Sequence, residues 1–393
     1  MAAGLELNEL VERGRDAAID LRRDLHAHPE LSDAEHRTTA VLRERLGSLK
    51  LRDVAVPTPT GAVAVLEGGR PGLTVLLRAD IDALPVEEAV DVPFRSRTHG
   101  VMHACGHDGH AAILMAVAAA LTARAEALPG RYALVFQPAE ETISGARRMI
   151  VGGLLEELRP DLALGLHLAS LLPTGLVGHR AGIAMSAART WRLILRGTGG
   201  HAAMSSDDGN VVAAAAALTS RLGAVAAGLE YREIGCVCAA GVLQAGTRYN
   251  VVPTRARVEG TLRTFTAEQD AETTSRLSAL ADTIAAEFGV SADLELIAHT
   301  PAVVNDERVT ATAAAAAAQE LGAEAVFEMP PMTPSDDMSE FLARVPGVYL
   351  TLGARPGEQR PPMHHAPDFA IDERSLQVGA RVLAAAAVAL ARP

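Results

Sequence analysis

The chain has 393 residues, of which 49% are hydrophobic and 21% charged, a composition typical of a folded globular protein. This length exceeds what a single core usually supports, so we expect two domains. The formal net charge of -12 argues against a nucleic-acid partner, because phosphate binding needs clustered Lys and Arg side chains.

Cysteine usage and hydropathy predict the compartment. Cys105, Cys236 and Cys238 are the only cysteines, and an odd number at these spacings predicts no disulfide framework. The first ten residues, "MAAGLELNEL", lack the basic and then apolar order of a secretory signal. No apolar run has the length of a membrane span. We therefore expect a cytoplasmic protein without a membrane partner.

The first part of the chain predicts helices and then a sheet. Residues 6–27 carry apolar positions at helical spacing, and a second helix should start after Pro29, capped by Ser32 or Asp33. Helices are also expected at 109–127 and 144–158. Short apolar runs read as buried strands, with these helices between several of them. The runs are "AVAVLEG", "LTVLLRAD", "RYALVFQPAEE", "DLALGLHLA" and, near the C-terminus, "GVYLTLG". Strands alternating with helices predict an α/β fold with a mixed, largely parallel sheet flanked by helices.

Residues 182–298 follow a different pattern. Three strands are predicted in "RTWRLILRG", "IGCVCAAGVL" and "TRARVEGTLRTF", helices at 209–229 and 267–288, and a last strand in "SADLELIA". The order β-α-β-β-α-β is that of a ferredoxin-like α+β domain. We therefore expect an inserted domain at 182–298, within a catalytic domain formed by 1–181 and 299–393.

Polar side chains follow the predicted strands of the first domain where each strand ends. These side chains are Asp80 and Asp82, Glu140 and Glu141, His167, and His364 and His365. Open α/β sheets bind ligands beyond the carboxyl ends of their strands. The strand ends therefore predict a functional site at one edge of the sheet.

The segment "HACGHDGH" adds a cysteine and histidines to this edge. Cys, His and carboxylate side chains together are the ligands of zinc and related divalent ions. If the segment is extended, Cys105 and His107 project to the same side and can reach the same metal cluster. Glu140 and Glu141 are adjacent and point differently, so one can bind metal while its neighbour acts as a base.

Each of these residues also has a structural interpretation. Cys105 could be a small core residue or a nucleophile, and the pair at 140–141 could be the solvated first turn of a helix. Asp108 could cap a helix or support a ligand through a hydrogen bond, and His110 could lie at a helix–sheet contact. The combination at strand ends favours a metal centre, because a nucleophilic Cys105 leaves the carboxylates and His365 without a role.

Several ordered motifs resemble a known family. The sequence is similar to the amidohydrolase branch of the metal-dependent aminoacylase and carboxypeptidase superfamily, which includes hippurate hydrolases and indole-acetyl-amino-acid hydrolases. The similar motifs extend over nearly the whole chain: "RRDLHAHPELSDAEHRT", "LRADIDALP", "MHACGHDGH", "FQPAEE", "GLHL", "GTGGHAAM", "NVVPTRARVEGTLRTF" and "HAPDFAIDE". The resemblance implies a zinc-exopeptidase-like catalytic domain and an inserted lid or dimerisation domain.

The resemblance also implies roles for individual residues. The ligands of two divalent ions, with Zn, Mn, Co and Ni not distinguished, would be Cys105, His107, Glu141, His167 and His365. Glu140 would be the general base, and His201 would stabilise the oxyanion or touch the substrate. Asn250 and Arg263 match positions associated with the carboxylate end of the substrate.

The implied activity is hydrolysis of the amide bond in N-acyl amino acids or related acyl conjugates, by a homodimer or higher homo-oligomer. Two alternatives are a dipeptidase or carboxypeptidase of the same superfamily and a metal-binding scaffold without catalysis. The sequence departs from the family pattern at "SSDDGNVV" and at Ser144, where a glycine is common. These departures leave the substrate preference and the geometry of His201 open.

Overall fold

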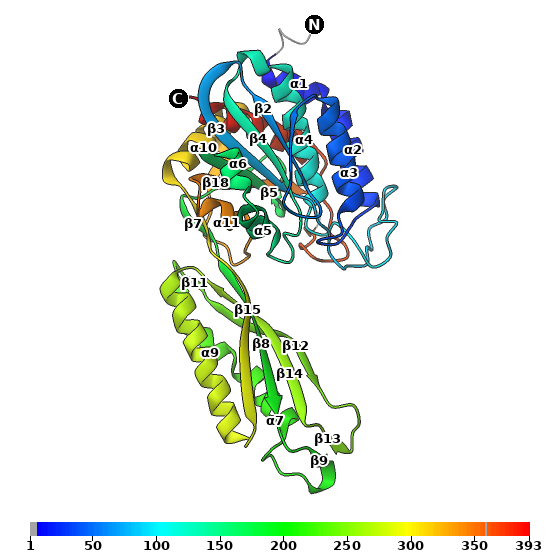
Figure 1. Cartoon of the computed structure of the whole chain (residues 1–393), viewed down its shortest axis with the longest axis vertical. Helices are drawn as coiled ribbons and strands as arrows, with labels where there is room; N and C mark the ends of the chain where they lie inside the picture. Colours follow the sequence, from blue (N-terminus) through cyan, green and yellow to red (C-terminus); the bar gives the residue numbers. More distant parts are fainter. Residues whose placement is uncertain (1–5, 358–359) are drawn as a thin grey trace. The chain divides into compact units, whose positions relative to one another are not determined.

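A computed structural model describes residues 6–357 and 360–393 of the chain. The chain divides into two compact units (Figure 1). The larger unit contains residues up to Ala184, Val304–Pro330 and Asp337–Pro393, and the smaller unit contains Met185–Val303 and Pro331–Asp336. Each unit is built around its own sheet and its own core.

The larger unit contains an eight-stranded mixed sheet. Its strands, in spatial order, are β1 (Arg52–Val54), β2 (Ala62–Glu67), β4 (Pro129–Gln137), β3 (Arg70–Asp80), β5 (Leu162–Pro173), β18 (Gly347–Arg355), β6 (Val177–His179) and β17 (Val326–Glu328). Parallel pairing joins β4 to β3, β3 to β5, β5 to β18 and β6 to β17. The other three pairs are antiparallel. Two short strands, β7 (Gly182–Met185) and β16 (Val303–Asn305), pair separately.

Helices flank this sheet. They are α1 (Leu7–Arg13), α2 (Arg15–Ala27), α3 (His36–Ser48), α4 (His107–Ala123), α5 (Gly145–Val151), α6 (Leu154–Leu158), α10 (Glu307–Leu321), α11 (Met338–Leu342) and α12 (Arg374–Leu390). Helix α4 packs on β3 and β5 and also on α2 and α12, so it is covered from several sides. This position explains its run of apolar residues, which lacks a polar face.

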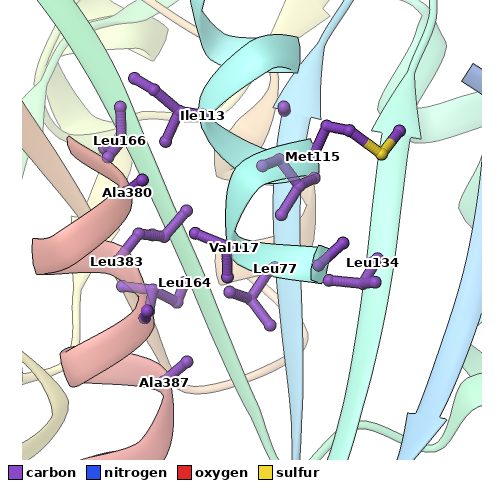
Figure 2. Close-up of a cluster of buried hydrophobic side chains, with 14 of the residues drawn as sticks. Leu77, Ile113, Met115, Val117, Leu134, Leu164, Leu166, Ala380, Leu383 and Ala387 are labelled. Carbon is purple, nitrogen blue, oxygen red and sulfur yellow. The ribbon is translucent and has the colours of Figure 1, made fainter. Parts of the chain in front are cut away.

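The core lies between the central strands and the pair α4 and α12 (Figure 2). Leu77 of β3 and Leu164 of β5 are fully buried against Ile113 and Val117 of α4 and Leu383 of α12. Burying one such side chain stabilises the fold by about 1.5–3 kcal/mol. Because side chains alternate along a strand, the neighbours of these leucines point to the opposite face of the sheet, where α11 packs on β5 and β18.

The smaller unit has four antiparallel strands in the order β12-β14-β8-β15. Its elements are β8 (Ala187–Arg196), β9 (Gly200–His201), α7 (Val211–Arg221), α8 (Gly223–Ala226), β10 (Glu230–Tyr231), β11 (Ile234–Gly235), β12 (Val237–Ala245), β13 (Val251–Val252), β14 (Arg255–Thr264), α9 (Ala267–Glu287) and β15 (Ser291–Thr300). Helices α7 and α9 pack on this sheet, and Trp191 is fully buried in its core. Thr266 and Gln269 start α9 as a reciprocal capping box.

The predicted fold class is confirmed, with a mixed and largely parallel sheet, flanking helices and a β-α-β-β-α-β unit. Two predicted helices are interrupted. The helix expected at 144–158 breaks at Gly152 and Gly153, where Gly153 has a φ of 93°. The helix expected at 209–229 is divided at Leu222 and ends with Ala226. Among the described residues, every helix is too short or too polar to span a bilayer.

Candidate metal centre

The candidate site forms where parallel strands of the large sheet end. Asp80 is the last residue of β3, and the chain reaches Glu140 and Glu141 directly after β4. His167 lies within β5, which continues to Pro173 and does not end at this histidine as predicted. Strand β5 pairs in parallel with β18 and, up to Gly165, with β3, so His167 stands just beyond the end of that β3 pairing. The sheet therefore brings side chains from separate parts of the sequence to one edge, as the strand ends predict.

The "HACGHDGH" segment differs from the extended conformation that we expected. Gly106 has a φ of 87°, and His107 is already the first residue of α4, so the segment turns sharply into a helix. The turn still brings Cys105 and His107 together, and donor atoms of these two residues and Glu141 lie within 4.8 Å of one another. The grouping of these side chains therefore depends on the left-handed Gly106 and not on strand alternation.

A second group of donor atoms shares Cys105. Its Sγ lies 3.6 Å from His167 Nε2 and 3.6 Å from His364 Nδ1. His365, the histidine expected as a ligand, lies on the Glu141 side, with Nε2 3.6 Å from Glu141 Oε2 and 52% of its side chain exposed. The other three expected ligands, His107, His167 and His365, therefore lie around Cys105 and Glu141 together with His364. His364 is an additional imidazole that the motif comparison did not assign.

The donor atoms fit divalent cations. His107 Nε2 and Glu141 Oε1 are buried without a hydrogen-bond partner among the described residues, and they lie 3.8 Å apart. Two atoms that each bind the same ion at about 2.0–2.2 Å are separated by a distance of this order. An ion between them would compensate for the desolvation of both groups. Sulfur, imidazole and carboxylate donors suit zinc and its transition-metal neighbours.

The protonation of these groups in the metal-free chain follows from their burial. Burial raises the pKa of the Cys105 thiol, and the nearby Glu141 carboxylate raises it further. Burial also raises the pKa of Glu141 to about 7. Burial lowers the pKa of His167 and of His365, so both imidazoles stay neutral and can donate a lone pair. Burial also lowers the pKa of His107, but the charges of Asp80 and Cys105 outweigh this effect, and the pKa is raised.

Two aspartates on the β3 side orient the histidines. His107 Nδ1 lies 3.2 Å from Asp82 Oδ1, which leaves Nε2 directed at Glu141. His110 accepts a hydrogen bond at Nε2 from the Leu168 backbone N–H at 2.9 Å, so its Nδ1 donates to Asp80 Oδ1 at 2.5 Å. This contact joins the start of α4 to β5 next to His167.

A fully buried arginine supports Asp80 from behind. Arg78 donates to Asp80 Oδ2 and to Asp337 Oδ1, each at 2.8 Å, and to Gln137 Oε1 at 2.8 Å. The sequence motifs did not single out Arg78. Its place two residues before the strand-end aspartate is a usable signal, because alternation along a strand puts both side chains on one face. Nothing in the sequence pattern marks Asp337 as its partner.

Asp108 is not the N-cap of α4, and among the described residues it belongs to none of the groups of possible metal donors. The N-cap position of α4 is Gly106, and the Asp108 carboxylate is fully buried between helices. Its Oδ2 accepts from Arg22 Nε at 2.8 Å and lies 2.8 Å from His26 Nδ1. Asp108 therefore attaches the first turn of α4 to α2, which is consistent with the supporting role considered for it.

Glu140, the expected general base, lies in a turn and not in the first turn of a helix. The residues after β4 turn back before α5 begins at Gly145, and Ile143 N donates to Glu140 O at 2.6 Å. Glu140 is 7% exposed. It does not belong to the two donor groups that contain Cys105, but to a separate group of buried carboxylates that includes Asp337. The adjacent carboxylates thus have different surroundings, as their adjacency predicted.

The three remaining expected residues belong to the smaller unit. His201 is the last residue of β9, and its exposed side chain accepts from Ala203 N at 3.2 Å. Asn250 lies next to it, because Ala202 N donates to Asn250 O at 3.2 Å. Arg263 is on β14, opposite Ala188 of β8. The structure therefore brings His201 and Asn250 together, and their roles stay predictions.

A mixed α/β sheet with cysteine, histidine and glutamate donors at its edge defines a metal-dependent hydrolase. Comparison with known proteins agrees. The model of peptidase family M20/M25/M40 matches residues 76–389. The chain is 35% identical over 372 residues to N-acetylcysteine deacetylase of Bacillus subtilis, covering 94% of this chain and 96% of that protein. It is 31% identical to thermostable carboxypeptidase 2 of Saccharolobus solfataricus, covering 95% of each.

A solved structure shares the whole fold. The B. subtilis YXEP protein, described as a dinuclear metal-binding peptidase from the M20 family, superposes with a TM-score of 0.79 at 32% identity and covers 96% of this chain and 98% of its own. The chain belongs to peptidase family M20/M25/M40. It is a metal-dependent amidohydrolase, and its cofactor is a pair of divalent metal ions.

Proposed function

We propose that the protein hydrolyses the amide bond of N-acyl amino acids or related acyl conjugates, giving a carboxylic acid and an amine. The observation that supports this proposal most directly is the division between the two adjacent carboxylates, since Glu141 joins the donor group of Cys105 and Glu140 does not. The similarity to an N-acetylcysteine deacetylase over nearly the full chain supports the same substrate class.

We assign the metal ligands to five residues: Cys105, His107, Glu141, His167 and His365. The chemistry that two divalent ions supply when bound is Lewis acidity, which polarises the amide carbonyl and acidifies water. Glu140 accepts the proton of the attacking water and returns it to the departing amine nitrogen. His201 stabilises the negative charge that develops on the carbonyl oxygen. Asn250 and Arg263 bind the carboxylate end of the substrate.

Replacing Glu140 with Gln tests the role of the base. Because the amide cannot accept the proton, we expect kcat to fall by about 10²- to 10⁴-fold, while the metal content stays at the wild-type value. Turnover of N-acetyl and N-benzoyl amino acids and metal content by mass spectrometry are measured on the same samples. Glu156→Gln, at an exposed position of α6, is the matched control and should keep wild-type turnover. Wild-type turnover in Glu140→Gln would refute the assignment.

The second candidate function is a carboxypeptidase or dipeptidase, which the similarity to a thermostable carboxypeptidase favours. The two candidates differ in the group on the acyl side of the amide, since a peptidase substrate carries a free or extended amino group there. Comparing kcat/KM for an N-acetyl amino acid with that for the dipeptide of the same C-terminal residue separates them. A preference for the dipeptide by more than about tenfold would favour the peptidase.

We also propose that the protein acts in the cytoplasm as a homodimer or a larger homo-oligomer. Cys105, Cys236 and Cys238 are free thiols, which a reducing compartment preserves. In the smaller unit, β12 is an edge strand whose outer backbone groups can pair with another chain. Sedimentation velocity of the metal-loaded protein tests the assembly, and a monomer at micromolar concentration would contradict it.

Manganese is among the ions that the five proposed metal ligands can hold.

A further inference from the structure

Three buried carboxylates from distant parts of the chain hold the turn that carries Glu140 and Glu141. Ala139 N donates to Glu35 Oε1 at 2.8 Å, Glu141 N to Asp82 Oδ2 at 3.0 Å, and Ala146 N to Asp337 Oδ2 at 2.9 Å. The three acceptor residues are each at most 1% exposed. Buried hydrogen bonds of this kind are costly to break, because breaking one leaves a donor and an acceptor without partners.

The turn needs such support because its backbone is strained. Ala139 has a φ of 55° and Ile143 a φ of 53°, in the left-handed region that side chains with a Cβ disfavour. For Ile143 the strain is larger, because its side chain is β-branched. Residues in this region persist only where surrounding contacts fix them, and they often occur at functional sites. The strained positions flank Glu140 on both sides.

Of the three acceptors, Glu35 holds the residue directly before Glu140, and its two side-chain hydrogen bonds involve no proposed metal ligand. Asp82 also contacts His107, and Asp337 binds the Arg78 network. Glu35 accepts one hydrogen bond from Ala139 N and another from Thr60 Oγ1 at 2.6 Å. It reaches the turn from the residue just before α3, across 104 positions of sequence.

We propose that Glu35 is a positioning residue for the general base, fixing the strained Ala139 backbone so that the Glu140 carboxylate is held in place. The proposal rests on the proposed function, because it takes Glu140 as the base. Glu35 lies in "HPELSDAEHRT", a motif to which the proposed chemistry gives no other role. What the proposal requires of Glu35 is an acceptor oxygen at the right distance from Ala139 N, and not a negative charge.

Two conservative variants separate the effect of side-chain length from the effect of charge at position 35. Glu35→Gln keeps the side-chain length, so its carbonyl oxygen can accept from Ala139 N and its amide can donate to the Thr60 hydroxyl. Glu35→Asp keeps the charge but shortens the side chain by one methylene group, which moves the carboxylate oxygen away from Ala139 N. We expect kcat to fall by about 10- to 100-fold in Glu35→Asp and to stay within about threefold of wild type in Glu35→Gln, with KM changed little in both.

Metal affinity and amide exchange give readouts that do not depend on turnover. In metal-free Glu35→Asp, hydrogen exchange should be faster in peptides covering 136–146 and unchanged in peptides covering 107–123, and zinc affinity should remain within about threefold of wild type. Wild-type kcat in Glu35→Asp would overturn the proposal. A fall of kcat in Glu35→Gln while Glu35→Asp kept the wild-type kcat would also overturn it. Unchanged hydrogen exchange of peptides covering 136–146 in Glu35→Asp would do the same.

The exchange measurement also separates this proposal from the proposed function. If Glu140→Gln kept turnover, the general-base assignment would fail, while faster exchange of 136–146 in Glu35→Asp would still show that Glu35 holds the turn. If Glu140→Gln lost turnover and the exchange of 136–146 in Glu35→Asp stayed unchanged, the positioning role alone would fail.

Discussion

At the scale of single residues, Cys105 shows how surroundings decide the chemistry of a side chain. In the metal-free chain, burial and the Glu141 carboxylate raise the pKa of its thiol, so it is protonated near neutral pH. A bound cation reverses this, because a coordinating thiol loses its proton. The same cysteine is therefore an inert buried thiol without metal and a ligand with it.

Metal binding should therefore release protons and strengthen as the pH rises. A group whose pKa is raised keeps its proton in the metal-free state, and both Cys105 and Glu141, the latter with a pKa of about 7, must lose it to bind. Calorimetric titration with zinc in buffers of different ionisation enthalpy measures this release. We expect at least one proton released per chain at neutral pH and weaker binding below it. Binding without proton release, equally strong across about pH 6–8, would contradict this assignment.

At the scale of elements, the strands were predictable and their long-range partners were not. Apolar runs bounded by polar residues identified β3, β4, β5 and β18, because buried parallel strands need continuous hydrophobic sequence. Since the carboxyl ends of parallel strands share an edge, the convergence of Asp80, Glu141 and His167 could also be predicted. The left-handed Gly106, which places His107 at the start of a helix, has no signal in a hydrophobic pattern.

A close contact in the smaller sheet gives an element-scale prediction. Gly260 on β14 lies opposite Trp191 on β8, and a Cβ there would approach Trp191 Cζ2 to 2.4 Å and Ala239 O to 2.1 Å. We expect Gly260→Ala to destabilise this unit by about 1–3 kcal/mol, because the core would be overpacked. Trp191 is the only tryptophan, so urea unfolding followed by its fluorescence reports on this unit.

Gly241→Ala is the matched control, since a Cβ at Gly241 on β12 would meet no atom within 4 Å. Its unfolding midpoint should lie close to that of the wild type. Equal midpoints for Gly260→Ala and Gly241→Ala would show that the sheet relaxes around the added methyl group, contrary to the tight packing described.

At the scale of the whole molecule, the metal centre is assembled from residues between Cys105 and His365 that meet only in the folded chain. The motifs identified the family and the ligand types, because donor chemistry is visible in the sequence. The supporting contacts were not visible. Arg78 and Asp337 are 259 positions apart, and Glu35 and Ala139 are 104 apart, so only the tertiary structure shows that they pair. Neither pairing follows from local spacing.

The central claim is that these side chains hold two divalent ions beside a carboxylate that acts as the base. Metal content and turnover of an N-acyl amino acid, measured on one preparation before chelation, after chelation and after metal is returned, test it most directly. We expect about two ions per chain, loss of turnover when they are removed and recovery when they return. Full turnover by metal-free protein would contradict the claim.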